Sequence, residues 1–367
     1  MTTQTLKNWH KVKLGDVAEI ESGGTPSSTK SEYWNGGDIR WATLPDLENK
    51  YLFDTQRKIT PLGLKNSSAK LLPINSVIFS SRATIGEVAI TKVETSTNQG
   101  SKNFICDPKK VDYEFLYYLL KSKVEEINNL ASGATYKEIN KTVFSSVEVE
   151  IPNIPVQKQI AQTLAVYDDL IYNNNRRVQI LEQLAQAIYI EWFVNFHFPD
   201  HEKVKMTDSG TDFGKIPQEW EVTKVGDIAE FMNGYAFKPR HLGISGWSAT
   251  LLVNIWNSGE GLLNQHLFKV TPKADYLYSF IFYFLANQIE KYRSHAVGAT
   301  MQHLRRDVVI NANVLLPNKD LLIKFENIAS DILKERSILI IENQNLRQTR
   351  DLLLPKLVTG EIEVSSI

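Results

Sequence analysis

The feature that most constrains this chain is a long apolar seam between Pro155 and Trp192. Apolar residues recur there at alternating steps of four and three, and Asn174 is the one polar member of the series. A 3.5-residue repeat places these side chains on the face by which one helix lies along another. At 1.5 Å per residue, roughly 38 residues form a rod about 57 Å long, and such a rod needs a partner helix to bury its seam.

The chain supplies that partner 165 residues further on. The same phase runs from Phe325 to Leu357, although Arg336, Asn343 and Arg350 interrupt it. A proline-ended apolar segment precedes each rod, which favours a duplicated module over two unrelated amphipathic core helices. The predicted helix–helix seam consists of Ile160, Leu164, Ile171, Val178, Leu181 and Ile188 in the first helix and Phe325, Ile332, Leu339, Leu346 and Leu353 in the second.

The repeat extends beyond the rods. Trp9–Ile20 is similar to Trp220–Phe231 at an offset of 211, whereas Asn98-Gln99 aligns with Asn264-Gln265 at an offset of 166. A fall from 211 to 166 means that the second copy lacks about 45 residues, opposite several expected strands of the first copy. The gap lies between roughly Pro239 and Trp247. We therefore expect two mixed α/β units, the second one shortened, each followed by a long helix.

These patterns set the expected boundaries along the chain. The predicted order is a globular unit over 1–154, a long helix over 155–197, a linker over 198–216, a second globular unit over 217–318, a second helix over 319–356 and a tail over 357–367. Pro355 is expected to stop the second helix, because proline lacks a backbone donor, and the tail is expected to end as a short strand.

Composition excludes several classes of protein. With Cys106 as the single cysteine, there is no disulfide framework and no cysteine zinc site. The longest strongly apolar run, Tyr276–Ala286, is too short to span a bilayer, and Met1–Lys13 lacks the features of a secretory signal, so we expect a cytoplasmic protein without a membrane partner. A formal net charge of −1 argues weakly against a nonspecific nucleic-acid binder but allows a basic face balanced by acidic helices.

Signals of catalysis are missing from the sequence. No glycine-rich loop precedes a Lys-Ser/Thr pair, and His201-Glu202 lacks the second histidine of a metal-binding helix. The acids of Pro45-Asp46 and Glu48 lie too close together for a nuclease centre, and no Asn/Asp-Pro-Pro-aromatic tetrapeptide of the amino-methyltransferase type occurs. We predict a binding protein with no catalytic residue, no metal and no cofactor of its own.

The candidate binding residues lie in turn-rich segments at equivalent places in both copies. Arginine, asparagine and glutamine can make paired contacts to guanine or adenine, whereas lysine suits phosphates. Taken singly, each segment also fits an ordinary solvated loop. The candidates for DNA contact are Arg82, Thr84, Asn98, Gln99, Lys102, Tyr136, Lys137 and Lys141 in the first copy and Gln265, Gln302, His303, Arg305 and Arg306 in the second.

Taken together, these segments resemble the specificity subunit of a type I restriction-modification system, over nearly the whole chain. The long-helix region carries the most specific part of the resemblance, through Gln157–Ala161, Tyr167–Ile171 and Glu191–Phe196. Phe213–Trp220 resembles the entry to a second target-recognition domain, and Arg350–Glu361 resembles the family's C-terminal ending.

The resemblance implies a mechanism. Each globular unit would read one half of a split double-stranded DNA target, and the two helices would pack antiparallel about a pseudo-two-fold axis, as a ruler for the gap. The complex would defend the cell against foreign DNA, and this chain would be a non-catalytic subunit of it. The chain would hold two methylation subunits, which modify adenine with S-adenosylmethionine, and restriction subunits, which cleave DNA with ATP and Mg²⁺.

Two alternatives to an active bipartite reader come from the same features. Near-zero net charge mildly favours a coiled-coil scaffold whose globular ends bind proteins. The shortened second copy leaves open a partially inactive subunit with one DNA-reading domain. A fused methylation-specificity enzyme would need a cofactor-binding glycine motif and the Pro-Pro tetrapeptide, both of which the sequence lacks.

Overall fold

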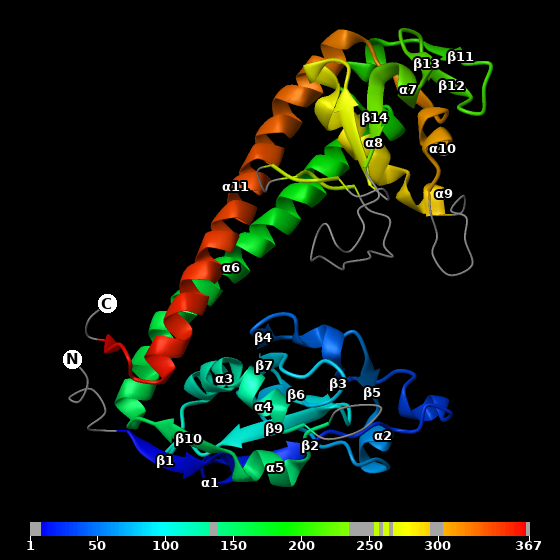
Figure 1. Ribbon diagram of the computed structural model, residues 1–367. Coiled ribbons are helices and arrows are strands. Elements are labelled where there is room, and N and C mark those ends of the chain that lie inside the picture. The colour runs from blue at the N-terminus through cyan, green and yellow to red at the C-terminus, as the bar shows by residue number, and fades with distance from the viewer. Residues whose placement is uncertain are drawn as a thin grey trace. The chain divides into compact units, whose positions relative to one another are not determined.

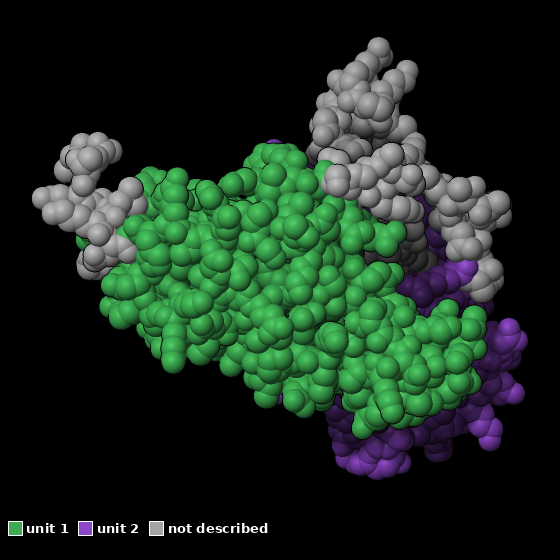
Figure 2. All heavy atoms as spheres, turned by 90° about the horizontal axis from the view of Figure 1, so that it is seen from below, with its two compact units in different colours: residues 1–173, 343–367 green, residues 174–342 purple. Residues whose placement is uncertain are grey.

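A computed structural model describes residues 9–131, 138–234, 253–256, 260–263, 267–293 and 304–364 (Figure 1). The chain forms two compact units. Unit 1 comprises Met1–Asn173 and Asn343–Ile367, and unit 2 comprises Asn174–Glu342, as coloured in Figure 2. The two long helices, α6 (Ile154–Tyr189) and α11 (Lys319–Val358), each contribute one part to unit 1 and the other part to unit 2.

The described residues of unit 1 form three sheets. A five-stranded sheet has the order β2 (Ala18–Ser22), β9 (Ser101–Cys106), β6 (Val77–Ser80), β7 (Val88–Thr91) and β4 (Tyr51–Leu52). A three-stranded sheet has the order β5 (Lys58–Ile59), β3 (Ile39–Ala42) and β8 (Thr95–Thr97), and β1 (His10–Lys13) pairs with β10 (Glu148–Ile151). The pairs β4–β7 and β3–β8 are parallel, and the other pairs are antiparallel.

Helices close the core of unit 1. The α-helices are α1 (Leu14–Val17), α2 (Pro61–Lys65), α3 (Tyr113–Ser122), α4 (Val124–Asn129) and α5 (Lys141–Ser146), with 3-10 turns η1 (Ser31–Tyr33) and η2 (Leu44–Leu47). Helix α3 begins at an Asp112 cap and packs on β6 and β7. Its residues from Phe115 to Leu120 are all buried, because the helix lies between the sheet and α6.

Unit 2 contains strand pairs and helices that repeat part of the element order of unit 1. Its paired strands are β11 (Met206–Asp208) with β12 (Lys215–Pro217), β13 (Glu221–Lys224) with β16 (Asn313–Leu316), and β14 (Ala229–Asn233) with β15 (Phe268–Pro272). Its helices are α7 (Val225–Ile228), α8 (Tyr278–Asn287), α9 (Ile289–Arg293) and α10 (Arg306–Ile310), with turns η3 (Ile190–Val194), η4 (His201–Lys203) and η5 (Asp275–Leu277).

Two strand pairs of unit 2, β13–β16 and β14–β15, correspond to β1–β10 and β2–β9 of unit 1. The β1–α1–β2 segment corresponds to β13–α7–β14, and Asp16 and Asp227 occupy the same capping position at α1 and α7. Val12 faces Val149 in unit 1 as Thr223 faces Val314 in unit 2. The described part of unit 2 holds no counterpart of β3 to β8, and the predicted junction of the missing segment, Pro239 to Trp247, lies outside the described residues. The predicted mixed α/β fold with an internal repeat is confirmed.

The two long helices pair antiparallel within each unit (Figure 1). In unit 1, Arg350 of α11 forms an ion pair with Asp168 of α6. In unit 2, Arg336 Nε lies 2.5 Å from Glu182 Oε1, and Asn174 Nδ2 donates to Glu342 at 3.1 Å. The arginines that interrupt the sequence seam are therefore polar contacts between the helices. All the predicted seam residues occupy buried or half-buried positions.

The ends of both helices differ from the sequence-based expectation. Helix α6 ends at Tyr189 and continues as the π-helical turn η3 to Val194, rather than running to 197. Helix α11 passes through Pro355 and ends at Val358. Leu357 and Val358 are buried in the core of unit 1, which offsets the donor that Pro355 lacks, and Gly360 ends the turn at φ +73°. No strand follows among residues 359–364.

The single cysteine tests the packing of β9. Burial raises the pKa of Cys106 to about 12, and Asp112 adds to the shift. Because the thiolate is the reactive form, we expect the folded chain to react with a thiol reagent at pH 8 on the order of a hundredfold more slowly than the denatured chain. Equal rates in buffer and in guanidinium chloride would contradict this placement of Cys106.

No helix in the described ranges is long and apolar enough to cross a membrane. Across those same ranges, no cluster of three or more His, Cys, Asp and Glu side chains is placed to hold a metal ion.

Candidate nucleic-acid interface

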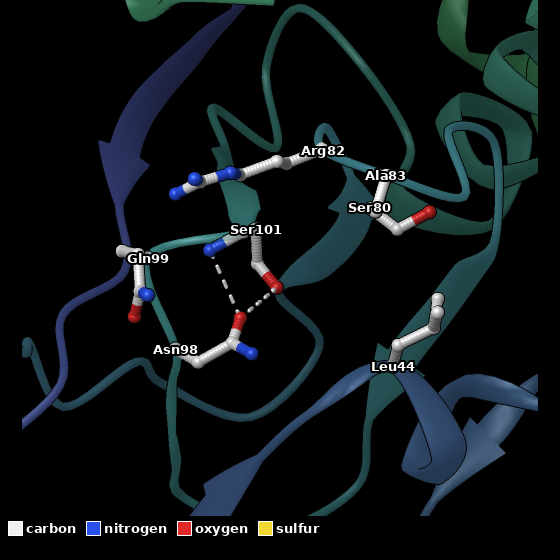
Figure 3. A pocket seen from close by; sticks show the side chains of 8 residues that line it. Leu44, Ser80, Arg82, Ala83, Asn98, Gln99 and Ser101 are labelled. Carbon is white, nitrogen blue, oxygen red and sulfur yellow. Dashed lines mark hydrogen bonds between the residues drawn. The ribbon is translucent and has the colours of Figure 1, made fainter. Parts of the chain in front are cut away.

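Three loops of unit 1 converge at one end of the five-stranded sheet. One follows β2, one joins β6 to β7, and one joins β8 to β9. The strand order brings them together, since β9 lies between β2 and β6. Two of these loops, β6–β7 and β8–β9, form an open pocket of about 290 Å³ together with Leu44 of η2 (Figure 3). The pocket is lined by Leu44, Ser80, Arg82, Ala83, Asn98, Gln99, Gly100 and Ser101.

A glycine pair, Gly23-Gly24, lets the loop after β2 (the first loop) pack against the β8–β9 loop. Gly23 N donates to Ser101 O at 3.2 Å, and Gly24 N donates to Thr97 O at 2.9 Å. The Trp41 indole donates to Gly24 O at 2.9 Å from β3. A Cβ atom on Gly23 would lie 1.9 Å from Asn98 O, so this approach requires glycine.

Hydrogen bonds of Asn98 fix the conformation of the β8–β9 loop. Asn98 N donates to Ala42 O at 3.0 Å, which joins the loop to the end of β3. The Asn98 Oδ1 atom accepts from Gly100 N at 3.0 Å and from Ser101 Oγ at 3.4 Å, as Figure 3 shows. Gln99 is exposed next to it, and its carboxamide oxygen accepts from the Thr25 hydroxyl of the first loop.

The β6–β7 loop presents Arg82 and Thr84 at exposed positions. Ser80 Oγ donates to Thr84 O and accepts from Glu87 N, both at 2.8 Å, and so closes the base of this loop. Ala83, between Arg82 and Thr84, has φ +63°, a conformation that L residues adopt at a cost of roughly 1–2 kcal/mol. The surrounding contacts hold this strained turn, which directs Arg82 to the pocket wall.

Lys102 does not lie where a direct phosphate contact needs it. Its side chain is only 4% exposed, and Nζ contacts Glu138 Oε1 at 3.4 Å and Ser81 Oγ at 3.2 Å. Ile139 N also donates to Ser81 O at 3.0 Å. Lys102 therefore ties the segment beginning at Glu138 to the β6–β7 loop from beneath the surface. Its place inside β9, with the side chain turned into the fold, is not visible in the sequence.

The remaining candidates of unit 1 are not gathered at the pocket. Lys141 is half exposed at the start of α5, with Nζ 3.9 Å from Glu21 Oε1. Tyr136 and Lys137 lie outside the described residues. Leu44 in the pocket lining, and Thr25 and the Gly23-Gly24 pair that pack against the β8–β9 loop, are not among the residues predicted from the sequence. Of these, only the glycine pair carries a local sequence signal.

The described part of unit 2 shows less of a comparable site. Arg305 is exposed and forms a two-point contact with Asp307, at 3.0 Å and 2.6 Å. Arg306 lines an open hollow of about 900 Å³ together with Glu230, Met232 and Lys273. Gln265, Gln302 and His303 lie outside the described residues.

Comparison with known proteins gives the class. The sequence profile of the type I restriction modification DNA specificity domain matches residues 6–183. The crystal structure of the S subunit of a type I restriction-modification system from M. genitalium superposes with a TM-score of 0.61 at 18% identity, over 97% of this chain and 98% of that chain. That likeness shows the fold.

Two relatives narrow the class to a family. The type I restriction enzyme MjaIX specificity subunit of Methanocaldococcus jannaschii is 30% identical over 419 residues, covering 98% of this chain and 95% of the relative. The type I restriction enzyme HindI specificity subunit of Haemophilus influenzae is 29% identical over 188 residues, 48% of this chain and 40% of the relative. The present chain belongs to the specificity subunits of type I restriction enzymes, which are non-catalytic subunits that recognise DNA sequence.

Proposed function

We propose that unit 1 is a target-recognition domain that reads one half of a split DNA target through the pocket at the end of its sheet. The observation that carries the proposal is the convergence of Arg82, Asn98 and Gln99, from two loops, on one open pocket. These side-chain types make paired contacts to base edges, and loops on a rigid scaffold are the usual carriers of recognition. Lys102 supports the loops in this proposal rather than contacting phosphate.

The two long helices would serve as the spacer between two recognition domains, residues 1–154 and 217–318. Antiparallel pairing within each unit and the matched order of strands support this role, because an internal repeat suits two half-sites on DNA. A protein-binding scaffold remains the second candidate, and the exposed apolar faces of the helices are the observation that favours it.

Those faces suit the methylation subunits. On α6, Val166 and Leu170 in unit 1, and Ile180 and Leu184 in unit 2, are exposed pairs four residues apart, so each pair lies on one side of the helix. Apolar pairs of this kind are what a further helix would cover in a bundle. We propose that two methylation subunits bind along these helices and that restriction subunits join the same complex.

The partner proposal predicts the effect of charges on this face. In the variant Ile180→Glu/Leu184→Glu, we expect recovery of the methylation subunit by affinity co-purification to fall at least tenfold, because two buried charges would stay unpaired. The variant Gln186→Glu, which adds one charge at an exposed position of the same helix, should bind normally. Equal recovery of all three proteins would contradict the proposal.

The chemistry would belong to the partners. We propose that this chain binds no cofactor, and that S-adenosylmethionine, ATP and Mg²⁺ are used by the methylation and restriction subunits in the cytoplasm. Acceptance of DNA by this chain would then decide where adenine is modified.

The shortened unit 2 predicts an unequal target. Since the described part of unit 2 lacks counterparts of β3 to β8, the strands that frame the pocket in unit 1, we expect the second half-site to be poorly specified. In a motif determined from modified adenines, the half read by unit 1 should have fixed bases, and the other half should tolerate substitutions. Equally strict halves would contradict this prediction.

Single-molecule methylation sequencing tests the function directly. DNA from cells carrying this chain with its methylation partner is compared with DNA from cells carrying the partner alone. We expect modified adenines in a split motif only when this chain is present. If none depends on the chain although the two proteins co-purify, the DNA-recognition proposal fails and the scaffold role gains support.

A further inference from the structure

The orientation of the Asn98 carboxamide is fixed by its neighbours. Gly100 N is a backbone donor and cannot accept a hydrogen bond, so the Asn98 atom 3.0 Å away from it must be the oxygen. This holds whichever way an amide is first placed, because a flipped amide would set two donors against each other. The Ser101 hydroxyl at 3.4 Å adds a second donor to the same oxygen.

The fixed oxygen leaves Asn98 with donors only. Its Nδ2 atom points away from Gly100 and Ser101 in Figure 3, and no residue in the described ranges accepts from it. The half-buried position of Asn98 and the backbone bond to Ala42 hold this arrangement. What Asn98 offers to a ligand at the pocket is therefore an N–H pair.

Other polar groups of the pocket wall are either donors or already have hydrogen-bond partners within the protein. Arg82 carries a guanidinium, which has donors and no acceptor. The Ser80 hydroxyl is engaged both as donor to Thr84 O and as acceptor from Glu87 N. The Gly100 carbonyl already accepts from Ser81 N at 2.7 Å and from Ser81 Oγ at 3.1 Å. The wall thus favours a ligand that presents acceptors.

A pocket wall that offers mainly hydrogen-bond donors distinguishes guanine from adenine. Reading adenine with asparagine needs the amide oxygen to accept from N6 while the nitrogen donates to N7, and the Asn98 oxygen is already occupied. Guanine presents two acceptors, O6 and N7, on its major-groove edge, which match donors from Arg82 and Asn98. Building on the proposed function, we infer that this pocket reads a guanine in the half-site of unit 1.

Donors also suit a phosphate oxygen, so the test must separate a base from the backbone. In the variant Asn98→Asp, the carboxylate can still accept from Gly100 N and Ser101 Oγ, while the outward atom changes from donor to acceptor. We expect methylation at sites with the guanine to fall at least tenfold, with a gain at sites that carry adenine or cytosine there, because these bases present amino donors. Asn35→Asp, an exposed position outside the pocket, controls for the added charge.

A DNA probe avoids dependence on the variant's folding. With the unaltered complex, 7-deazaguanine at that position removes N7 and keeps base pairing, so affinity should fall about tenfold, whereas inosine, which keeps O6 and N7, should bind as guanine does.

The outcomes are distinct. A split motif with no fixed guanine in either half, or Asn98→Asp weakening all sites equally with an unchanged motif, overturns the guanine inference and leaves the DNA-recognition function standing. No methylation dependent on the unaltered chain overturns the function itself, and the inference with it.

Discussion

Replacing Arg350 by alanine is expected to destabilise unit 1 by about 3 kcal/mol, because it leaves a buried carboxylate without its cation. The Asp168 side chain is 6% exposed and is bonded to Arg350 and to the Tyr118 hydroxyl, at 2.5 Å for the latter. These contacts join α3, α6 and α11 within the unit. The measurement is the denaturant midpoint of the near-ultraviolet circular dichroism transition.

The second copy provides the matched control. At the offset of 165, Leu333 stands where Asp168 is, Ala185 where Arg350 is, and Tyr283 where Tyr118 is. The Tyr283 hydroxyl is buried and has no hydrogen-bond partner among the described residues. Unit 2 therefore tolerates Leu333 and Ala185 at the positions that hold the Asp168–Arg350 ion pair in unit 1. The double variant Asp168→Leu/Arg350→Ala should therefore recover much of the loss, since no charge stays buried. A double variant that is less stable than Arg350→Ala would refute this account.

Replacing Gly23 by alanine is expected to lower the affinity for target DNA tenfold or more. The new Cβ would lie 1.9 Å from Asn98 O and 2.4 Å from Thr97 Oγ1, so the first loop must move away from the β8–β9 loop. That movement would break the bonds from Gly23 and Gly24 to the strand ends and open the pocket. Such overpacking costs about 1–3 kcal/mol of stability, which a folded unit can survive.

The control for this prediction is another glycine of unit 1. Gly36 has φ +71° and open space around its Cβ position, so Gly36→Ala carries a backbone cost of about 1 kcal/mol without a clash. Affinity is measured by fluorescence anisotropy on the complex with the methylation subunit. Should Gly23→Ala bind target DNA as well as Gly36→Ala does, while both stay folded, the glycine pair would have no part in shaping the site.

The length of the match to the MjaIX subunit bears on the shortened unit. The match to the MjaIX subunit spans 419 residues, whereas this chain has 367 residues, so that relative carries positions that this chain lacks. The fall in repeat offset from 211 to 166 had located such a loss within the second copy. The two observations agree that residues are missing, and the unequal-target prediction follows from where they are missing.

The architecture can be predicted from patterns in the amino-acid sequence. The 3.5-residue seam and the repeat offsets predicted two mixed α/β units and two pairing helices, because periodicity and repetition record which faces are buried. The roles of the polar residues and the proline within this pattern could not be predicted from the sequence. Arg336 and Arg350 read as interruptions, and Pro355 as a stop, because their partners and packing come from residues far away in the chain.

The hydrogen-bonding groups that the pocket presents depend on long-range contacts. Lys102 and Asn98 lie four residues apart and looked alike as DNA contacts, yet Lys102 is buried against Glu138, and Asn98 presents only its amide nitrogen. Nothing local distinguishes them, since burial and hydrogen-bond direction depend on which strands become neighbours. Sequence patterns determine the faces of helices and strands, whereas the donors and acceptors that a surface offers are settled only when long-range partners have taken their share.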